Sequence, residues 1–181
     1  MPILVLGTVA LDSIKTPHGS RSRIIGGSAS HFSMSARLFT KVSIAACVGD
    51  DFPQKNINFL KAKGLDLSAV SVEKGKTFHW EGEYREDFNT AITLKTELGV
   101  LSSFKPCLLP AQRKIKHVFL ANVDPDIQLF LLKNMRSPEI VALDSMNYWI
   151  NSKRKSLLKL FKKVDIFLAN DKEASVLSGE P

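Results

Sequence analysis

The chain has 181 residues, a hydrophobic content of 44%, a charged content of 24% and a formal net charge of +7. This composition is typical of one globular domain, and no run reaches the roughly 18 consecutive apolar residues that a membrane span requires. The two cysteines show no metal-ligand spacing and no disulfide framework, so a reducing cytoplasm is the simplest compartment.

Strand-like and helix-like segments alternate along most of the chain. The predicted strands are 3–9, 42–48, 69–72, 117–121, 140–143 and 164–169, and the predicted helices are 28–38, 52–63, 127–135, 150–163 and 172–177. Such alternation predicts an α/β protein whose mostly parallel sheet is covered by helices on both faces.

One region interrupts this alternation. Polar and aromatic residues alternate from Thr77 to Arg85, and 91–98 follow as a second extended run. A period of two residues is typical of strands with one covered face. Together with the polar stretch 12–23, the region predicts a small β excursion from the α/β body.

Much of the positive charge lies in the predicted helix 150–163, where lysines accompany leucines at helical spacing. This pattern predicts an amphipathic helix with a solvated basic face. The charge excess could help to attract an anionic substrate. No recognised nucleic-acid-binding motif accompanies it, so we expect no nucleic-acid partner and no membrane partner.

Two glycine-containing turns are candidate ligand sites. Gly26 and Gly27 precede a helix, which would let the backbone approach a ligand and leave the first helical N–H groups free for it. The turn at 48–51 delivers Asp50 and Asp51 to the end of a strand, where ligands bind in open α/β sheets. A plain loop-to-helix junction is the alternative for the first turn. An N-cap for the helix near Phe52 would explain at least one aspartate of the second.

Polar residues follow further strands. Asp12 could accept hydrogen bonds from ligand hydroxyls, or serve as a turn or capping residue. The run 144–147 also follows a strand. Asn170 and Glu173 lie one helical turn apart and could hold a hydrated Mg²⁺ or a phosphate-linked water, although the residues alone favour a capping box. The coincidence of four such strand ends predicts a ligand cleft.

In chain order, the motifs at these strand ends are Gly7-Thr8 with Asp12, Gly26-Gly27-Ser28, Val48-Gly49-Asp50-Asp51, Asp144-Ser145-Met146-Asn147 and Asn170-Asp171-Lys172-Glu173. Together and in this order they resemble the motifs of the ribokinase-like (PfkB) carbohydrate kinases. The resemblance covers 1–181 and implies a Rossmann-like three-layer α/β/α domain with a small β-strand lid near 12–23 and 77–98. It also implies transfer of the ATP γ-phosphoryl group, with Mg²⁺, to a hydroxyl of a sugar or nucleoside.

The resemblance assigns roles to individual residues. The implied substrate-binding residues are Asp12, Gly26, Gly27, Ser28, His31, Phe78, Trp80 and Asn147. Asn170 and Glu173 match the family's Asn-x-x-Glu motif, which acts on Mg²⁺ and phosphate. The sequence departs from the family at His31, where Asn is usual, and at Phe39, where Gly or Ser is usual.

Family members also carry a Gly-Ala-Gly-Asp loop, which supplies the anion hole and the catalytic base. The resemblance places this loop beyond Pro181, so we expect a C-terminally incomplete domain with no catalytic base and no activity alone. A homodimer through the lid strands is a further expectation. The alternative is a non-catalytic module from a split or truncated kinase gene that binds a small molecule or a partner. A Rossmann dehydrogenase fits poorly because Gly-x-Gly-x-x-Gly does not follow the first strand.

Overall fold

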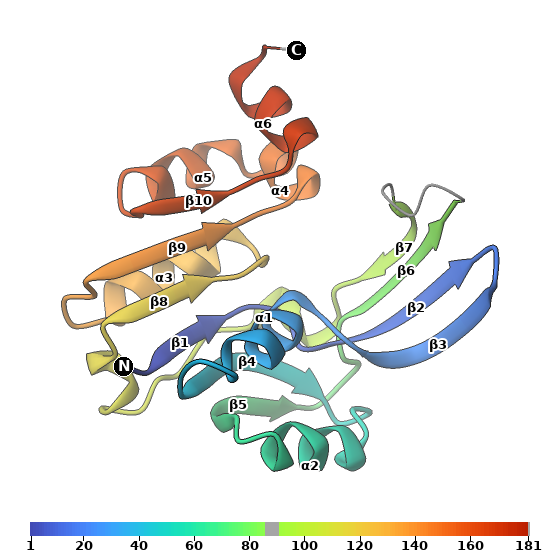
Figure 1. Cartoon of the computed structure of the whole chain (residues 1–181), viewed down its shortest axis with the longest axis horizontal. Helices are drawn as coiled ribbons and strands as arrows, with labels where there is room; N and C mark the ends of the chain where they lie inside the picture. Colours follow the sequence, from blue (N-terminus) through green and yellow to red (C-terminus); the bar gives the residue numbers. More distant parts are fainter. Residues whose placement is uncertain (86–90, 181) are drawn as a thin grey trace.

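The computed structural model describes residues 1–85 and 91–180 and places a parallel sheet at the centre of the chain (Figure 1). The sheet has six strands in the order β10-β9-β8-β1-β4-β5. In chain order they are β1 (Ile3–Leu6), β4 (Val42–Gly49), β5 (Asp66–Glu73), β8 (His117–Leu120), β9 (Ile140–Asp144) and β10 (Ile166–Leu168). All neighbouring pairs run parallel.

Helices cover both faces of this sheet. They are α1 (Ser28–Ala36), α2 (Gln54–Ala62), α3 (Pro125–Asn134), α4 (Asn147–Ser152), α5 (Arg154–Phe161) and α6 (Asp171–Ser178). Successive side chains of a strand point to opposite faces. Thus Val5 packs with the core of α1 and α2, whereas Leu4 and Leu6 pack with the core of α3 and α5. The three-layer α/β/α prediction is confirmed.

A second sheet of four strands, in the order β3-β2-β6-β7, projects beyond one end of the body (Figure 1). We call it the lid sheet. Its strands are β2 (Ala10–Thr16), β3 (Gly19–Gly26), β6 (His79–Tyr84) and β7 (Ala91–Glu97). The polar stretch 12–23 therefore belongs to a β-hairpin. Of the segment 77–98 given by the sequence, 86–90 lie outside the described residues.

Several boundaries differ from the sequence-based prediction. The first strand ends at Leu6 because the chain leaves the body there to enter the lid sheet. The helix predicted at 150–163 is two helices, interrupted at Lys153, whose backbone has φ −127° and ψ 27°. The ammonium of Lys153 contacts Asp126 at 2.6 Å and Asp124 at 3.5 Å, at the start of α3. The interruption thus lies at a residue that contacts positions distant in sequence, and the helical spacing of 150–163 does not reveal it.

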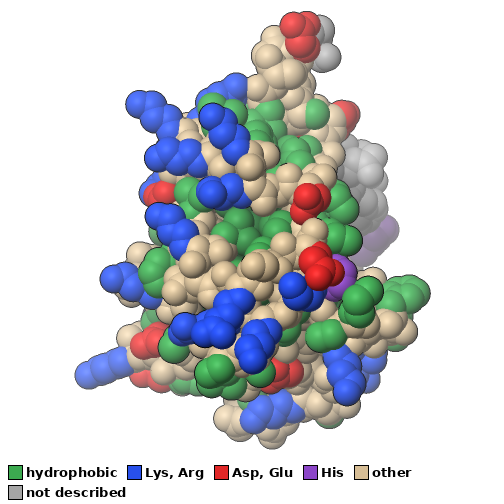
Figure 2. All heavy atoms as spheres, turned by 90° about the vertical axis from the view of Figure 1, so that its left-hand side faces the viewer, with side chains coloured by type: hydrophobic (Ala, Val, Ile, Leu, Met, Phe, Trp, Pro, Cys, Tyr) green, Lys and Arg blue, Asp and Glu red, His purple; other side chains and the backbone are tan. Residues whose placement is uncertain are grey.

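The molecular surface shows how the positive charge is distributed. Figure 2, seen from the side that holds the amino ends of β8 and β9, shows Lys and Arg side chains spread over this face. Lys155, Lys159, Lys162 and Lys163 are exposed, so the basic face of α5 is solvated as predicted. None of the helices in the described part of the chain is long and apolar enough to cross a membrane.

Both cysteines are free. Cys47 is buried in β4, where burial raises the pKa of its thiol to about 12, and Cys107 is exposed. The high thiol pKa makes Cys47 an inert core residue at neutral pH.

Candidate substrate site

The carboxyl ends of β8, β9 and β10 point toward the lid sheet (Figure 1). The chain enters that sheet just after β1, which lies between β8 and β4. This is the point where the strand order reverses, and open α/β sheets bind ligands at such a point. By this rule the predicted site would lie between the body sheet and the lid sheet.

Asp12 and the Gly26-Gly27 turn form the base of this site. Asp12 Oδ2 accepts a hydrogen bond from the backbone N–H of Gly27 at 3.3 Å. Gly27 has φ 91°, and a Cβ there would lie 2.3 Å from the carbonyl oxygen of Thr8. A side chain at residue 27 is thus excluded both by the backbone conformation and by the lack of space.

The other oxygen of Asp12, Oδ1, is buried and has no hydrogen-bond partner among the described residues. Burial raises the pKa of Asp12, and the hydrogen bond from Gly27 and the nearby His31 and His79 act against that rise. A buried oxygen without a partner is costly in a folded protein. Asp12 therefore offers an acceptor that a ligand hydroxyl would satisfy.

Thr8 accepts hydrogen bonds from the backbone N–H groups that were predicted to be free at the start of α1. Its Oγ1 accepts from Ser28 N at 2.9 Å, and its carbonyl oxygen accepts from Ala29 N at 3.0 Å. The hydroxyl of Ser28 donates to the carbonyl oxygen of Asn122 at 3.0 Å. The expectation that these N–H groups remain free is thus wrong, because a residue twenty positions earlier fills the helix N-terminus. Ser28 ties the ends of β1 and β8 together.

The lid residues Trp80 and Phe78 lie in different environments. Trp80 is paired with Asp12 across β6 and β2, so both side chains lie on the same face of the lid sheet. The indole of Trp80 covers Gly82 and donates to Thr93 Oγ1 at 3.1 Å. Phe78 instead packs against the hydrophobic core of the body. Of the two aromatic residues, Trp80 is the one that shares the face of Asp12.

The two remaining predicted substrate residues are exposed on helices. His31 is exposed on α1, near enough to Asp12 to affect its pKa. Asn147 is exposed at the start of α4. Their predicted roles in substrate binding stay predictions.

Two residues at the end of β8 and on α3 were missed by sequence reasoning. Asn122 donates through Nδ2 to the sulfur of Met146 at 3.0 Å, and its Oδ1 is buried without a partner in the described part of the chain. Gln128 is fully buried on α3, and its Nε2 faces the carbonyl oxygens of Leu120, Ala121 and Asp144 at 3.4, 3.0 and 3.3 Å. Gln128 thereby holds the carboxyl ends of β8 and β9 together. No motif in the sequence marks either residue.

The charge of Glu173 acts on the carboxyl group of Asp144, which lies at the end of β9. Burial raises the pKa of Asp144 to about 6, and the charge of Glu173 contributes to the rise. Backbone hydrogen bonds from Ser145 and Asn122 oppose it. The carboxyl groups of Asp144 and Glu173 thus interact electrostatically.

Asn170 and Glu173 form the capping box that the residues alone favoured. Glu173 N donates to Asn170 Oδ1 at 2.9 Å, and Asn170 N donates to Glu173 Oε2 at 3.1 Å. Within 1–85 and 91–180 we find no group of three or more His, Cys, Asp or Glu that could hold a metal ion by itself. The capping function is therefore present, and a role toward Mg²⁺ stays a prediction.

The glycine-containing turn at 48–51 contacts the lid sheet through Asp51, and its role as a ligand site stays a prediction. Asp51 Oδ1 accepts from both Thr77 N and Thr77 Oγ1 at 2.7 Å, and Oδ2 accepts from Arg23 at 2.7 Å. The N-cap position of α2 is Pro53, and neither aspartate caps that helix. Asp51 binds the lid sheet rather than a helix end.

A shallow pocket lies at the opposite end of the sheet, lined by Met1, Pro2, Ala111 and 114–117. Its lining comes from the amino ends of the strands and contains none of the predicted site residues.

Comparison with known proteins agrees with this architecture. No family model matches the chain. The chain is 29% identical over 183 residues to a cytidine kinase from Thermococcus kodakarensis, covering 99% of this chain and 65% of that protein.

Solved structures with the same fold include the nucleoside kinase of Methanocaldococcus jannaschii, an archaeal member of the ribokinase family, with a TM-score of 0.74 and 20% identity over 98% of this chain and 63% of that one. The nucleoside kinase of Burkholderia thailandensis in complex with inosine has a TM-score of 0.78 and 16% identity, with 98% and 63% covered. Ribokinase from Cryptococcus neoformans in complex with ADP has a TM-score of 0.78 and 18% identity, with 99% and 62% covered.

The chain thus spans slightly less than two thirds of the length of these relatives. It has the ribokinase-like fold, and the resemblance to ribokinase-like kinases that its motifs indicated is confirmed.

Proposed function

We propose that this chain, with its ribokinase-like fold, is the substrate-binding and lid part of an ATP-dependent kinase that phosphorylates a hydroxyl of a nucleoside or sugar. The observation that carries the proposal is the buried Oδ1 of Asp12 beside the Gly26-Gly27 turn, which has no hydrogen-bond partner among the residues that the structure describes. A carboxylate oxygen in that position accepts hydrogen bonds from ligand hydroxyls. A nucleoside is the favoured substrate, because the similar proteins include a cytidine kinase and a nucleoside kinase in complex with inosine.

The proposed roles follow from position. Asp12 would accept a hydrogen bond from a substrate hydroxyl, and Gly26 and Gly27 would let the substrate approach the backbone. The indole of Trp80, on the same face of the lid sheet as Asp12, would cover the substrate and exclude water. Aromatic side chains stack well on flat rings, which suits a nucleobase. Asn122 Oδ1 would accept a second hydrogen bond at the end of β8.

ATP and Mg²⁺ are the proposed cofactors. One structural relative was solved with ADP. Mg²⁺ in phosphoryl-transfer sites is held by one or two carboxylates together with waters and substrate phosphates. Glu173 would be the carboxylate that the resemblance implies for such a site. Bound Mg²⁺ would neutralise negative charge on the transferring phosphate.

We further propose that these 181 residues bind substrate without turning it over, because the catalytic base that the resemblance implies is not among them. Phosphoryl transfer depends almost entirely on positioning and on stabilisation of charge. The homodimer through the lid strands and the cytoplasmic location stay predictions.

Calorimetric titration of the purified chain with cytidine, inosine and ribose tests the proposal. We expect a nucleoside to bind, and Asp12→Ala to weaken that binding about ten- to a hundred-fold, the loss typical of a charge-assisted hydrogen bond. Ser20→Ala, an exposed change further along the neighbouring strand β3, is the control. Failure of all three ligands to bind would overturn the proposal. ADP release by the chain alone would overturn the claim that it lacks turnover, whereas binding without activity in a chain extended by the family's catalytic loop would favour the non-catalytic module.

A further inference from the structure

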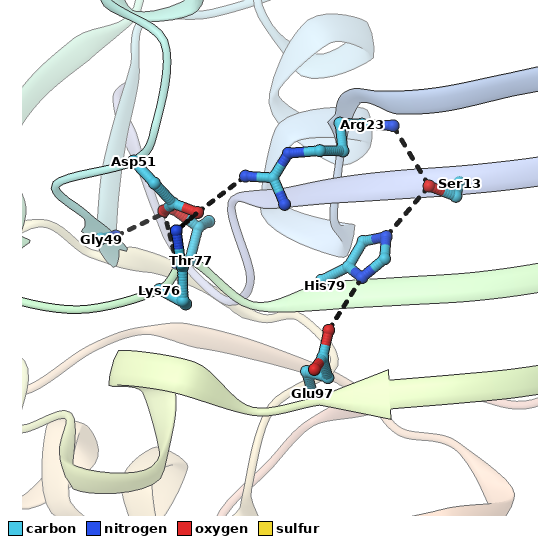
Figure 3. A network of polar contacts seen from close by, with 8 residues as sticks. All are labelled: Ser13, Arg23, Gly49, Asp51, Lys76, Thr77, His79 and Glu97. Atoms are coloured by element: carbon cyan, nitrogen blue, oxygen red, sulfur yellow. Dashed lines mark hydrogen bonds and ion pairs between the residues drawn. The ribbon is translucent and has the colours of Figure 1, made fainter.

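A continuous series of polar contacts runs from the body across all the strands of the lid sheet (Figure 3). It begins at Asp51, which follows β4, and reaches Arg23 on β3. It continues through Ser13 on β2 and His79 on β6, and ends at Glu97 on β7. These strands are in the spatial order of the lid sheet, so one network touches each of them in turn.

Asp51 is the point at which this network is attached to the body. Its side chain is only 12% exposed, and its two oxygens have separate partners. Oδ1 binds the backbone and hydroxyl of Thr77, a residue 1% exposed just before β6, and Oδ2 binds the guanidinium of Arg23. Desolvation acts to raise the pKa of Asp51, but the hydrogen bonds from Thr77 and Arg23 outweigh it and lower the pKa. The carboxylate is therefore charged at neutral pH and holds two parts of the lid sheet at once.

The backbone around Thr77 is also held by close packing. Gly49 N donates to Thr77 Oγ1 at 3.0 Å, and a Cβ on Gly49 would lie 2.1 Å from the carbonyl oxygen of Gly75. A Cβ on Gly99, which follows β7, would lie 2.0 Å from the carbonyl oxygen of Lys76. The entry to β6 and the exit from β7 thus pass close to each other and to the end of β4.

The network within the lid sheet lies on the face opposite Asp12. Arg23 has φ 51°, at an irregularity in the pairing of β2 and β3, and its N–H donates to Ser13 Oγ at 3.2 Å. Ser13 Oγ lies 3.0 Å from Nε2 of His79, whose Nδ1 lies 3.2 Å from Glu97. A left-handed backbone is unfavourable for a residue with a side chain and persists only where the surroundings hold it. Ser13 follows Asp12 on β2, and His79 precedes Trp80 on β6. Since successive side chains of a strand point to opposite faces, the network supports the face of the lid sheet opposite Asp12 and Trp80.

We propose that Asp51 is a positioning residue for substrate binding: it fixes the lid sheet to the body through Thr77 and Arg23, and so holds Asp12 and Trp80 in place without touching the substrate. The part of this proposal that concerns the substrate rests on the proposed function. The part that concerns the lid sheet rests on the contacts alone.

Two variants separate the two oxygens of Asp51. Thr77→Val removes the hydroxyl that Oδ1 binds and keeps the shape of the side chain, whereas Arg23→Met removes the guanidinium on Oδ2. Asp51→Asn removes the charge from both. Asp50→Asn is the matched control, because Asp50 is the exposed neighbour and carries the same charge. Amide hydrogen exchange of the ligand-free chain measures how firmly the lid sheet is held. Exchange in the lid strands β2 and β6 is compared with exchange in the body elements β8 and α3.

We expect Asp51→Asn and Thr77→Val to speed exchange in β2 and β6 about tenfold, to leave β8 and α3 as in the wild type, and to weaken nucleoside binding about tenfold. Arg23→Met should give a smaller effect in the same direction, since its side chain is 47% exposed and screened by solvent. Unchanged exchange in the lid sheet would overturn the proposal, and so would an equal rise in β2, β6, β8 and α3, which indicates general destabilisation. If cytidine, inosine and ribose all fail to bind the wild type, the proposed function fails, while the exchange data still decide how the lid sheet is held.

Discussion

Gly26 and Asp12 are packed so closely that a Cβ on residue 26 would lie 1.9 Å from Oδ2 of Asp12. The φ of Gly26 is not in the left-handed region, so the backbone would accept alanine there. The glycine is required by the carboxylate beside it rather than by the chain conformation.

We therefore predict that Gly26→Ala displaces the Asp12 carboxylate and weakens nucleoside binding at least tenfold, as measured by calorimetry. In an Asp12→Ala background the same change should cost little more, because the two nearest atoms, Oδ2 and Cγ of Asp12, are then absent. Equal costs of Gly26→Ala in the two backgrounds would contradict the steric explanation.

A second prediction concerns pH. Burial raises the pKa of Asp144 from its ordinary 3.8 to about 6, so the folded protein holds this proton more tightly than the unfolded chain. This carboxyl therefore lowers stability as pH rises from about 4 to about 6, by roughly 3 kcal/mol at most, and has a constant effect above that interval. Asp144→Asn should remove the effect, so its stability relative to the wild type should increase over the same interval.

Urea unfolding of both proteins at several pH values between 4 and 7 measures the difference. The comparison must be made between the two proteins, because Asp51, Asp66 and Asp126 have lowered pKa values and act in the opposite direction. Parallel pH profiles for the two proteins would show that Asp144 titrates normally.

Much of the fold could be predicted because its signals are local. Alternation of strand and helix patterns gave the parallel sheet, and the period-two pattern after Thr77 gave strands of the lid sheet. The capping box of Asn170 and Glu173 likewise depends on residues three positions apart. In each case the interacting groups are neighbours in sequence, so their spacing carries the information.

The parts that could not be predicted depend on distant partners. Thr8 fills the N-terminus of α1 from twenty positions away, Asp51 binds Thr77 across 26 positions, and Gln128 binds Asp144 across 16. An aspartate after a glycine looks the same in sequence whether it binds a ligand, a helix end or another sheet. Only the tertiary arrangement decides among these functions.

A third prediction concerns Gln128, whose amide holds the carboxyl ends of β8 and β9 together. Gln128→Met keeps the size of the side chain and removes the amide that faces three carbonyl oxygens. We expect it to lower the free energy of unfolding by about 1 kcal/mol, the net contribution of a hydrogen bond, because the change also removes Oε1 of Gln128, a buried oxygen with no partner in the described part of the chain. Gln54→Met on α2 is the matched control, because Gln54 is exposed and donates to Asn58 in the same helix. A loss no larger than that of the control would mean that the three carbonyl groups do not depend on Gln128.

The last prediction separates the two functions that Asn170 and Glu173 can have. The capping box satisfies helix N–H groups, so Asn170→Ala should lower the stability of the chain by about 1 kcal/mol. Glu173→Gln keeps an oxygen that can still accept from Asn170 N, so its stability should change by well under about 1 kcal/mol. It removes the charge that raises the pKa of Asp144, and that pKa, followed by carboxyl NMR, should therefore fall.

The Mg²⁺ function would appear only in a chain that also carries the catalytic loop. There we expect Glu173→Gln to reduce turnover strongly and to raise the Mg²⁺ concentration needed for half-maximal rate, because a neutral amide binds the cation more weakly than a carboxylate. Glu173→Gln would then act on turnover with little change in stability. If Glu173→Gln instead lowers the unfolding temperature by several degrees while turnover per folded molecule is unchanged, Glu173 acts only as a cap, and the resemblance of this motif to the kinases is structural.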